Sequence, residues 1–162
     1  MTTNFLGIPV IGDITQGANR VDQKPIEEFQ PILQAVLDDP TIVEFGWRQY
    51  TPYFNDGEPC EFSVYGTWVR TTEDKDVKDE YELEVGSHRT LGTRPYRENP
   101  ETNRWEQQPY EGPDAARYDR CRALMSAVEG GSFEHVLVEA FGDHATVTVR
   151  RDGIEVEFYD HD

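Results

Sequence analysis

The C-terminal segment carries the pattern that most restricts the fold of this chain. Apolar and polar residues alternate over positions 145–150 and again over 154–159, on either side of the pair Asp152-Gly153. Period-two alternation is typical of a half-buried strand, and an Asp-Gly pair is typical of a hairpin turn. A turn closed by Arg151 and Ile154 predicts four cross-strand pairs: Arg150–Glu155, Val149–Val156, Thr148–Glu157 and Val147–Phe158. One face of this hairpin is then uniformly apolar, and a slip by one residue would destroy that face.

Three further stretches have apolar residues that recur at helical spacing: 28–37, 113–129 and 133–141. Pro31 is acceptable in the first helix if that helix begins near Phe29 or Gln30, because the first turn does not need the N–H that proline lacks. Ser132 is a candidate N-cap for the third helix.

A second hairpin is predicted upstream of the long helix. Apolar residues alternate with polar residues or glycine over 43–48, and a return strand over 60–70 follows the turn sequence Asn-Asp-Gly at 55–57. Phe62, Val64 and Trp68 are expected on one face of the return strand. A further strand is predicted over 81–85.

These elements predict an α+β fold in a single domain. We expect an antiparallel sheet of about four to five strands, built from two hairpins and packed by two or three helices. Residues 1–24 are predicted to form an N-terminal arm or loop, and residues 25–162 to form the domain. Within the domain, 86–113 shows neither helical nor strand periodicity and is predicted as a long irregular loop.

The net charge limits the partners of the chain. Its 162 residues include 15 Lys plus Arg and 32 Asp plus Glu, which gives a formal charge of −17. Such a chain lacks the positive surface that nucleic acids and anionic membranes require. We therefore expect no membrane partner, and no direct nucleic-acid contact over most of the surface. The aromatic content of 12% argues for a folded core rather than disorder.

The predicted register of the C-terminal hairpin places His144 opposite His161. Three carboxylates lie beside this pair: Asp143, Asp160 and Asp162. Imidazole and carboxylate groups at short reach are ligands for a divalent metal. The alternatives are a solvated polar end of the sheet and a histidine pair that titrates near neutral pH.

The turn region 49–60 is a second candidate site, with Tyr50, Tyr53, Asn55 and Asp56 as binding residues. Aromatic rings at a strand end can stack on a ligand or anchor a partner protein. The alternative is that the polar residues only make the turn and the rings only fill the edge of the core.

Charge is distributed unevenly over the middle of the chain. An acidic run occupies 73–84, and it is predicted to be a solvated face, a docking surface for a basic partner, or a mimic of duplex phosphates. The next stretch, 86–97, has no acid and contains Arg89, Arg94 and Arg97. These arginines are candidates for phosphate or carboxylate capture, unless the stretch folds back and neutralises the acidic run.

No catalytic or cofactor motif is present in the sequence. The phosphate-binding, dinucleotide-binding, zinc-protease and serine-hydrolase patterns are all missing, so we expect no cofactor and favour a non-enzymatic role. The two cysteines do not form a disulfide framework, and the apolar opening at 5–11 is too short for a membrane span. A cytoplasmic location is the expectation.

Two segments carry a resemblance to a known group. Residues 47–62, WRQYTPYFNDGEPCEF, and residues 141–162, FGDHATVTVRRDGIEVEFYDHD, resemble segments of small uncharacterised proteins of tailed bacteriophages. The resemblance covers roughly a quarter of the chain and implies a phage or prophage origin, with the cytoplasm of an infected bacterium as its setting. It implies no catalytic or binding residues.

The first functional expectation is therefore an accessory or interaction protein that binds a basic or nucleic-acid-binding host protein through an acidic surface. The alternatives are a small-molecule or metal-binding domain that uses 49–60 or the histidine pair, and a structural component of the virion.

Overall fold

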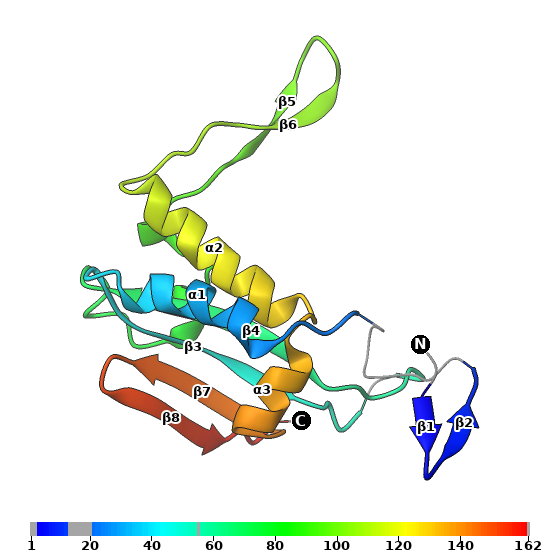
Figure 1. The fold of residues 1–162 in the computed structure, drawn as a ribbon. Coiled ribbons are helices and arrows are strands. Elements are labelled where there is room, and N and C mark those ends of the chain that lie inside the picture. Colours follow the sequence, from blue (N-terminus) through cyan, green and yellow to red (C-terminus); the bar gives the residue numbers. More distant parts are fainter. Residues whose placement is uncertain (1–2, 13–20, 55, 162) are drawn as a thin grey trace.

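The computed structural model describes residues 3–12, 21–54 and 56–161, and within them three α-helices pack on a four-stranded antiparallel sheet (Figure 1). The sheet order is β4-β3-β7-β8. Its strands are β3 (Ile42–Tyr50), β4 (Ser63–Thr71), β7 (Ala145–Arg150) and β8 (Gly153–Phe158). The predicted α+β class, the single domain and the two hairpins are confirmed.

The helices are α1 (Ile26–Leu37), α2 (Ala115–Glu129) and α3 (Glu134–Phe141). Helix α1 begins earlier than predicted, so Pro31 lies inside it rather than in its first turn. Proline there removes one backbone bond, and burial of Phe29 and Val36 on the same helix offsets that cost. Ser132 is not the cap of α3, because Phe133 occupies the N-cap position and makes no side-chain cap bond.

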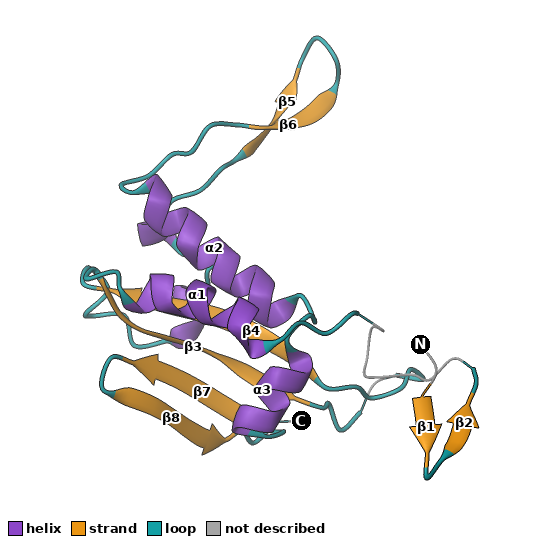
Figure 2. Ribbon diagram, in the orientation of Figure 1, coloured by secondary structure: helices purple, strands orange, loops and turns teal. Residues whose placement is uncertain are grey.

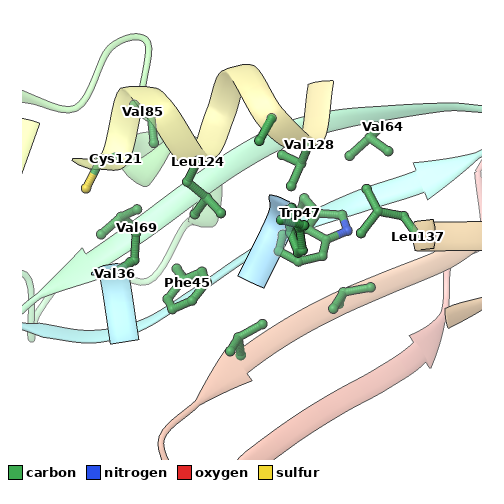
Figure 3. Packing of buried hydrophobic residues seen from close by; sticks show 14 of the residues in the cluster. Val36, Phe45, Trp47, Val64, Val69, Val85, Cys121, Leu124, Val128 and Leu137 are labelled. Atoms are coloured by element: carbon green, nitrogen blue, oxygen red, sulfur yellow. The ribbon is translucent and has the colours of Figure 1, made fainter. Parts of the chain in front are cut away.

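The core lies between the helices and one face of the sheet. Phe45 and Trp47 from β3 pack with Leu124 and Val128 from α2 and with Leu137 from α3 (Figure 3). All five side chains are at most 1% exposed. This burial of apolar area accounts for most of the stabilisation of the fold.

The β3–β4 hairpin contains a bulge that the alternation did not reveal. Gly46 pairs with Trp68, but Arg48 pairs with Tyr65, so β4 has one extra residue between these pairs. Gly66 in this bulge has a φ of 63°, a conformation that favours glycine. The prediction that Val64 and Trp68 share a face is therefore wrong, because the bulge turns Trp68 to the opposite face.

The register of the β7–β8 hairpin differs from the prediction by two residues. Arg150 pairs with Gly153 and Thr148 with Glu155, so the turn has Arg151 and Asp152 at its centre. The predicted turn placed Asp152-Gly153 at the centre instead. A two-residue shift keeps every side chain on its predicted face, because the period of a strand is two.

The middle segment is more regular than predicted. Residues 80–83 form a 3₁₀ helix, η1 (Glu80–Leu83), where a strand was predicted, because the Asp79 side chain accepts a hydrogen bond from the Tyr81 N–H and turns the chain. The 86–113 segment, predicted to be irregular, contains a second 3₁₀ helix and a hairpin: η2 (Arg89–Leu91), β5 (Tyr96–Asn99) and β6 (Arg104–Gln107). We call the β5–β6 hairpin the arm, and Figure 2 shows it extending away from the sheet and helices.

The predicted N-terminal arm contains a short hairpin of β1 (Thr3–Phe5) and β2 (Ile8–Val10). Among the described residues, no helix is long and apolar enough to cross a membrane.

Candidate functional site

The two sites predicted from the sequence meet at one end of the sheet. The His161 ring stacks on the Tyr53 ring, with centroids 4.4 Å apart and planes 10° apart, and its centroid lies 4.1 Å from that of Tyr50. The His144 ring lies 5.0 Å from both Tyr53 and His161. We call Tyr50, Tyr53, His144, His161 and Tyr159 the aromatic cluster. The sequence indicated the tyrosines at 50 and 53 and the histidine pair as separate candidates, but it did not indicate that they are in contact.

Asp143 fixes His144 to the end of β3. Its Oδ1 atom accepts hydrogen bonds from the Thr51 N–H at 2.7 Å and the His144 N–H at 2.8 Å, and its Oδ2 atom accepts one from the Thr51 hydroxyl at 2.6 Å. Burial raises the pKa of the Asp143 carboxyl, but these bonds outweigh burial and hold the pKa below its ordinary value of 3.8. Asp143 is therefore a charged anchor at neutral pH.

The two histidines of the aromatic cluster form a hydrogen-bonded pair. The Nδ1 atom of His144 lies 2.7 Å from the Nε2 atom of His161. Two nitrogens on one zinc ion would lie about 3.3 Å apart, so this spacing fits a direct hydrogen bond better than a shared metal. Among the residues that the structure describes, no three His, Cys, Asp or Glu side chains gather in a way that could hold a metal ion. The metal site at His144 and His161 stays a prediction, and this geometry does not favour it.

Tyr50 and Tyr159 of the aromatic cluster remain protonated at neutral pH. Burial raises the pKa of the Tyr50 hydroxyl, and the neighbouring Tyr65 raises it further. Burial also raises the pKa of the Tyr159 hydroxyl, although Arg48 opposes this effect. The cluster therefore offers stacking surfaces and hydrogen-bond donors rather than a phenolate base.

The remaining predicted residues of the 49–60 segment do not add to this cluster. Asn55 lies outside the described residues. Asp56 is exposed in the turn that follows it.

The arginines predicted as an anion site are mostly paired with acids. Arg94 lies 3.1 Å from Asp119 and Arg97 lies 3.0 Å from Glu111. These acids belong to α2 and to the segment before it, so the arginines do not fold back onto the acidic run. Arg89 is exposed and takes part in no ion pair with a described residue.

Two cavities flank Arg89. They have volumes of about 480 and 370 Å³, and Ser87, His88 and Arg89 line both. The buried His88 ring lies between them, with its Nε2 atom 3.0 Å from the Asp74 carboxylate. Both ring nitrogens are shielded from solvent. This ring therefore supports the loop from inside and does not present a reactive nitrogen to either cavity.

The acidic run at 73–84 is not a uniform surface. Asp74 is buried and Glu84 forms an ion pair with Arg48 at 2.9 Å, so both have structural roles. The exposed acids of the run alternate with Lys75 and Lys78, and these acids are Glu73, Asp76, Asp79, Glu80 and Glu82. The run alone therefore does not form a continuous acidic face.

A second group of acids lies where η1 approaches β8. Glu155 and Glu157 lie on the face of the sheet that the helices leave uncovered, and Glu157 faces both Glu155 and Glu80. The hydrogen bond to Glu155 and the charges of Glu155 and Glu80 raise the pKa of the Glu157 carboxyl. We call Glu80, Glu155 and Glu157 the acidic edge. The strand pattern predicted that Glu155 and Glu157 lie on one face of a strand. The sequence could not show that this strand is at the edge of the sheet.

One cation partly compensates the acidic edge. Arg150 contacts Glu155 at 2.9 Å and Glu44 at 2.8 Å. The charge of Arg150 also acts on Glu157, although no cationic side chain of a described residue lies within ion-pair distance of Glu157. Because Arg150 is shared with Glu44, the three carboxylates of the acidic edge keep a net negative charge.

Comparison with known proteins gives no further information about this site. No protein-family model matches the chain, and neither a curated protein nor a solved structure matches it.

Proposed function

We propose that this chain is a non-enzymatic interaction protein that binds a basic segment of another protein at its acidic edge. The observation that carries the proposal is the placement of the acids: Glu155 and Glu157 lie on one face of the edge strand β8, and Arg150, the cation beside them, is shared with Glu44. A lysine or arginine from a partner would relieve the repulsion between these acids.

The sequence resemblance supports a setting for this interaction. Because the two segments 47–62 and 141–162 resemble segments of tailed-phage proteins, we propose that the partner is a basic host protein in the bacterial cytoplasm. The net charge of −17 favours fast association with such a partner and disfavours direct binding to nucleic acid.

A labelled octalysine peptide tests the proposal, because it offers charge without apolar side chains. The edge variant replaces Glu80, Glu155 and Glu157 with glutamine. A control variant replaces Glu58, Glu98 and Glu101, three exposed acids elsewhere, and so has the same net charge. We expect the affinity, measured by fluorescence anisotropy, to fall about tenfold for the edge variant and about twofold for the control.

Equal losses for the two variants would show that only total charge matters and would contradict the proposal. Failure of the unmodified protein to bind octalysine at low salt would contradict it as well.

A further inference from the structure

The two outer edges of the sheet differ in how they are covered. At the β4 edge, the Val85 N–H donates a hydrogen bond to the Thr67 carbonyl at 2.9 Å, and Glu84 forms a bridge with Trp68. At the opposite edge, β8 pairs with β7 and with no other described strand. Natural sheets usually cover or block such an edge, because its free backbone groups pair readily with another strand.

The register shows which backbone groups of β8 are free. The Tyr159 N–H donates to the His144 carbonyl at 2.7 Å, which makes these residues a hydrogen-bonded pair. Such pairs recur at every second position of an antiparallel ladder, so Glu155 and Glu157 also bond to β7. The N–H and C=O groups of Ile154, Val156 and Phe158 therefore point away from the sheet.

The same three residues leave apolar side chains uncovered. Ile154, Val156 and Phe158 are 47%, 45% and 71% exposed, although they lie on the face of the sheet that carries the core. Their neighbours on β7, Val147 and Val149, are at most 1% exposed. The apolar face of the sheet therefore continues onto β8, but its side chains there are left partly exposed to solvent.

We infer that β8 accepts an extended segment of a partner protein in which basic side chains alternate with apolar ones. This inference rests on the proposed function and specifies how the partner binds. Main-chain bonds to Ile154, Val156 and Phe158 supply affinity. Basic side chains meet the acidic edge on one face, and apolar side chains cover the β8 side chains on the other.

Charge selects a basic partner rather than a second copy of this chain. Two β8 strands paired antiparallel about Val156 would place Glu155 of each directly opposite Glu157 of the other. Like charges in directly opposed positions destabilise strand pairing. A partner with lysine or arginine at these positions reverses the sign of the interaction.

A pair of synthetic peptides tests strand addition. The first alternates lysine with valine over about nine residues, and the second has the same composition with the lysines and valines in two separate blocks. We expect the alternating peptide to bind about tenfold more tightly, because only it places charge and apolar groups on opposite faces of a strand. We also expect its binding to slow hydrogen exchange at the amides of Ile154, Val156 and Phe158.

Val156→Pro is the matched variant. It removes an outward N–H, and proline is tolerated at such a position of an edge strand because the bonds to β7 remain. We expect this variant to keep its melting temperature within a few degrees and to bind the alternating peptide about tenfold more weakly. Val156→Thr, which keeps the N–H, is expected to bind within about threefold of the unmodified chain.

The outcomes separate this inference from the proposed function. If both peptides bind equally and exchange at the three amides is unchanged, strand addition is wrong, while the octalysine comparison still decides the proposed function. If Val156→Pro does not fold, the exchange measurement on the unmodified chain decides alone. Concentration-dependent dimerisation that protects the same amides would show that a second copy is the occupant and would overturn the inference.

Discussion

At the scale of single residues, Asp74 and Glu157 show how differently this chain treats its carboxylates. Asp74 is 3% exposed and accepts hydrogen bonds from the N–H and hydroxyl of Thr71 and from the hydroxyl of Thr90. Burial raises the Asp74 pKa, but these bonds and the contact with His88 outweigh burial and lower it. Glu157 is exposed, and repulsion raises its pKa. Asp74 therefore stabilises the fold in its charged form, whereas Glu157 does not.

Asp74→Asn is expected to destabilise the protein by about 3 kcal/mol. The asparagine amide removes the negative charge that faces His88. Its NH₂ group also cannot accept a hydrogen bond from a donor such as the Thr71 N–H. Urea unfolding at neutral pH measures the change. Asp76→Asn, at an exposed position of the same run, is the control and is expected to change stability by less than about 0.5 kcal/mol. Equal effects of the two variants would contradict the structural role of Asp74.

Glu157→Gln is expected to raise the melting temperature at pH 7 and to leave it unchanged near pH 3. The pKa of Glu157 is raised on folding, so its contribution to stability is present below its unfolded-state pKa and is lost as pH rises through the folded value. Glutamine removes the repulsion at neutral pH only. Thermal unfolding at the two pH values checks this, and a lower melting temperature at pH 7 would contradict the like-charge contact.

Gly46→Ala is expected to cost about 3 kcal/mol or more. A Cβ atom at this position of β3 would lie 2.1 Å from the Val147 carbonyl oxygen, and the backbone of a central strand cannot move aside. Gly86→Ala is the control, because a Cβ there meets nothing within 4 Å. Urea unfolding of both variants separates the two cases, and similar stabilities would show that the β3–β7 contact is looser than described.

At the scale of elements, the arm is independent of the core. Tyr96 and Trp105 on the arm are 61% and 66% exposed, and the arm joins the domain at the bridge between Thr93 and Glu111. Its two aromatic side chains lie on one face of the hairpin, by its register. They bury little area and so add little to folding.

Replacing residues 96–107 by a short Gly-Ser linker is therefore expected to change the unfolding free energy by less than about 1 kcal/mol. It is also expected to leave octalysine binding unchanged. A large loss of stability on urea unfolding would show that the arm packs on the domain.

The elements also show what the sequence could and could not predict. Periodicity predicted the three helices and the faces of β7 and β8, because burial on one side dictates the spacing of apolar residues. It could not predict the bulge at Gly66 or the centre of the β7–β8 turn, since both change the register without changing the composition. The arm was missed because its strands are short and exposed and so carry no apolar alternation.

For the molecule as a whole, the proposed function depends on the order of the strands in the sheet. β7 lies between β3 and β8, so β8 is an edge strand of the sheet. One side of its backbone therefore pairs with no described strand. The convergence of Tyr50, Tyr53, His144 and His161 has the same origin, because it depends on β3 and β7 being neighbours. Local periodicity carries no information about such long-range contacts. The sequence therefore predicted these residues as two separate sites, and the structure shows that they are in contact.

An NMR titration of the isotopically labelled protein with the alternating lysine–valine peptide tests binding at β8 residue by residue. We expect the amide shift changes to concentrate on residues 153–158 and on η1, and to be weak on the arm and around Arg89. Shift changes spread evenly over all acidic segments, or centred on the cavities beside Arg89, would contradict this expectation.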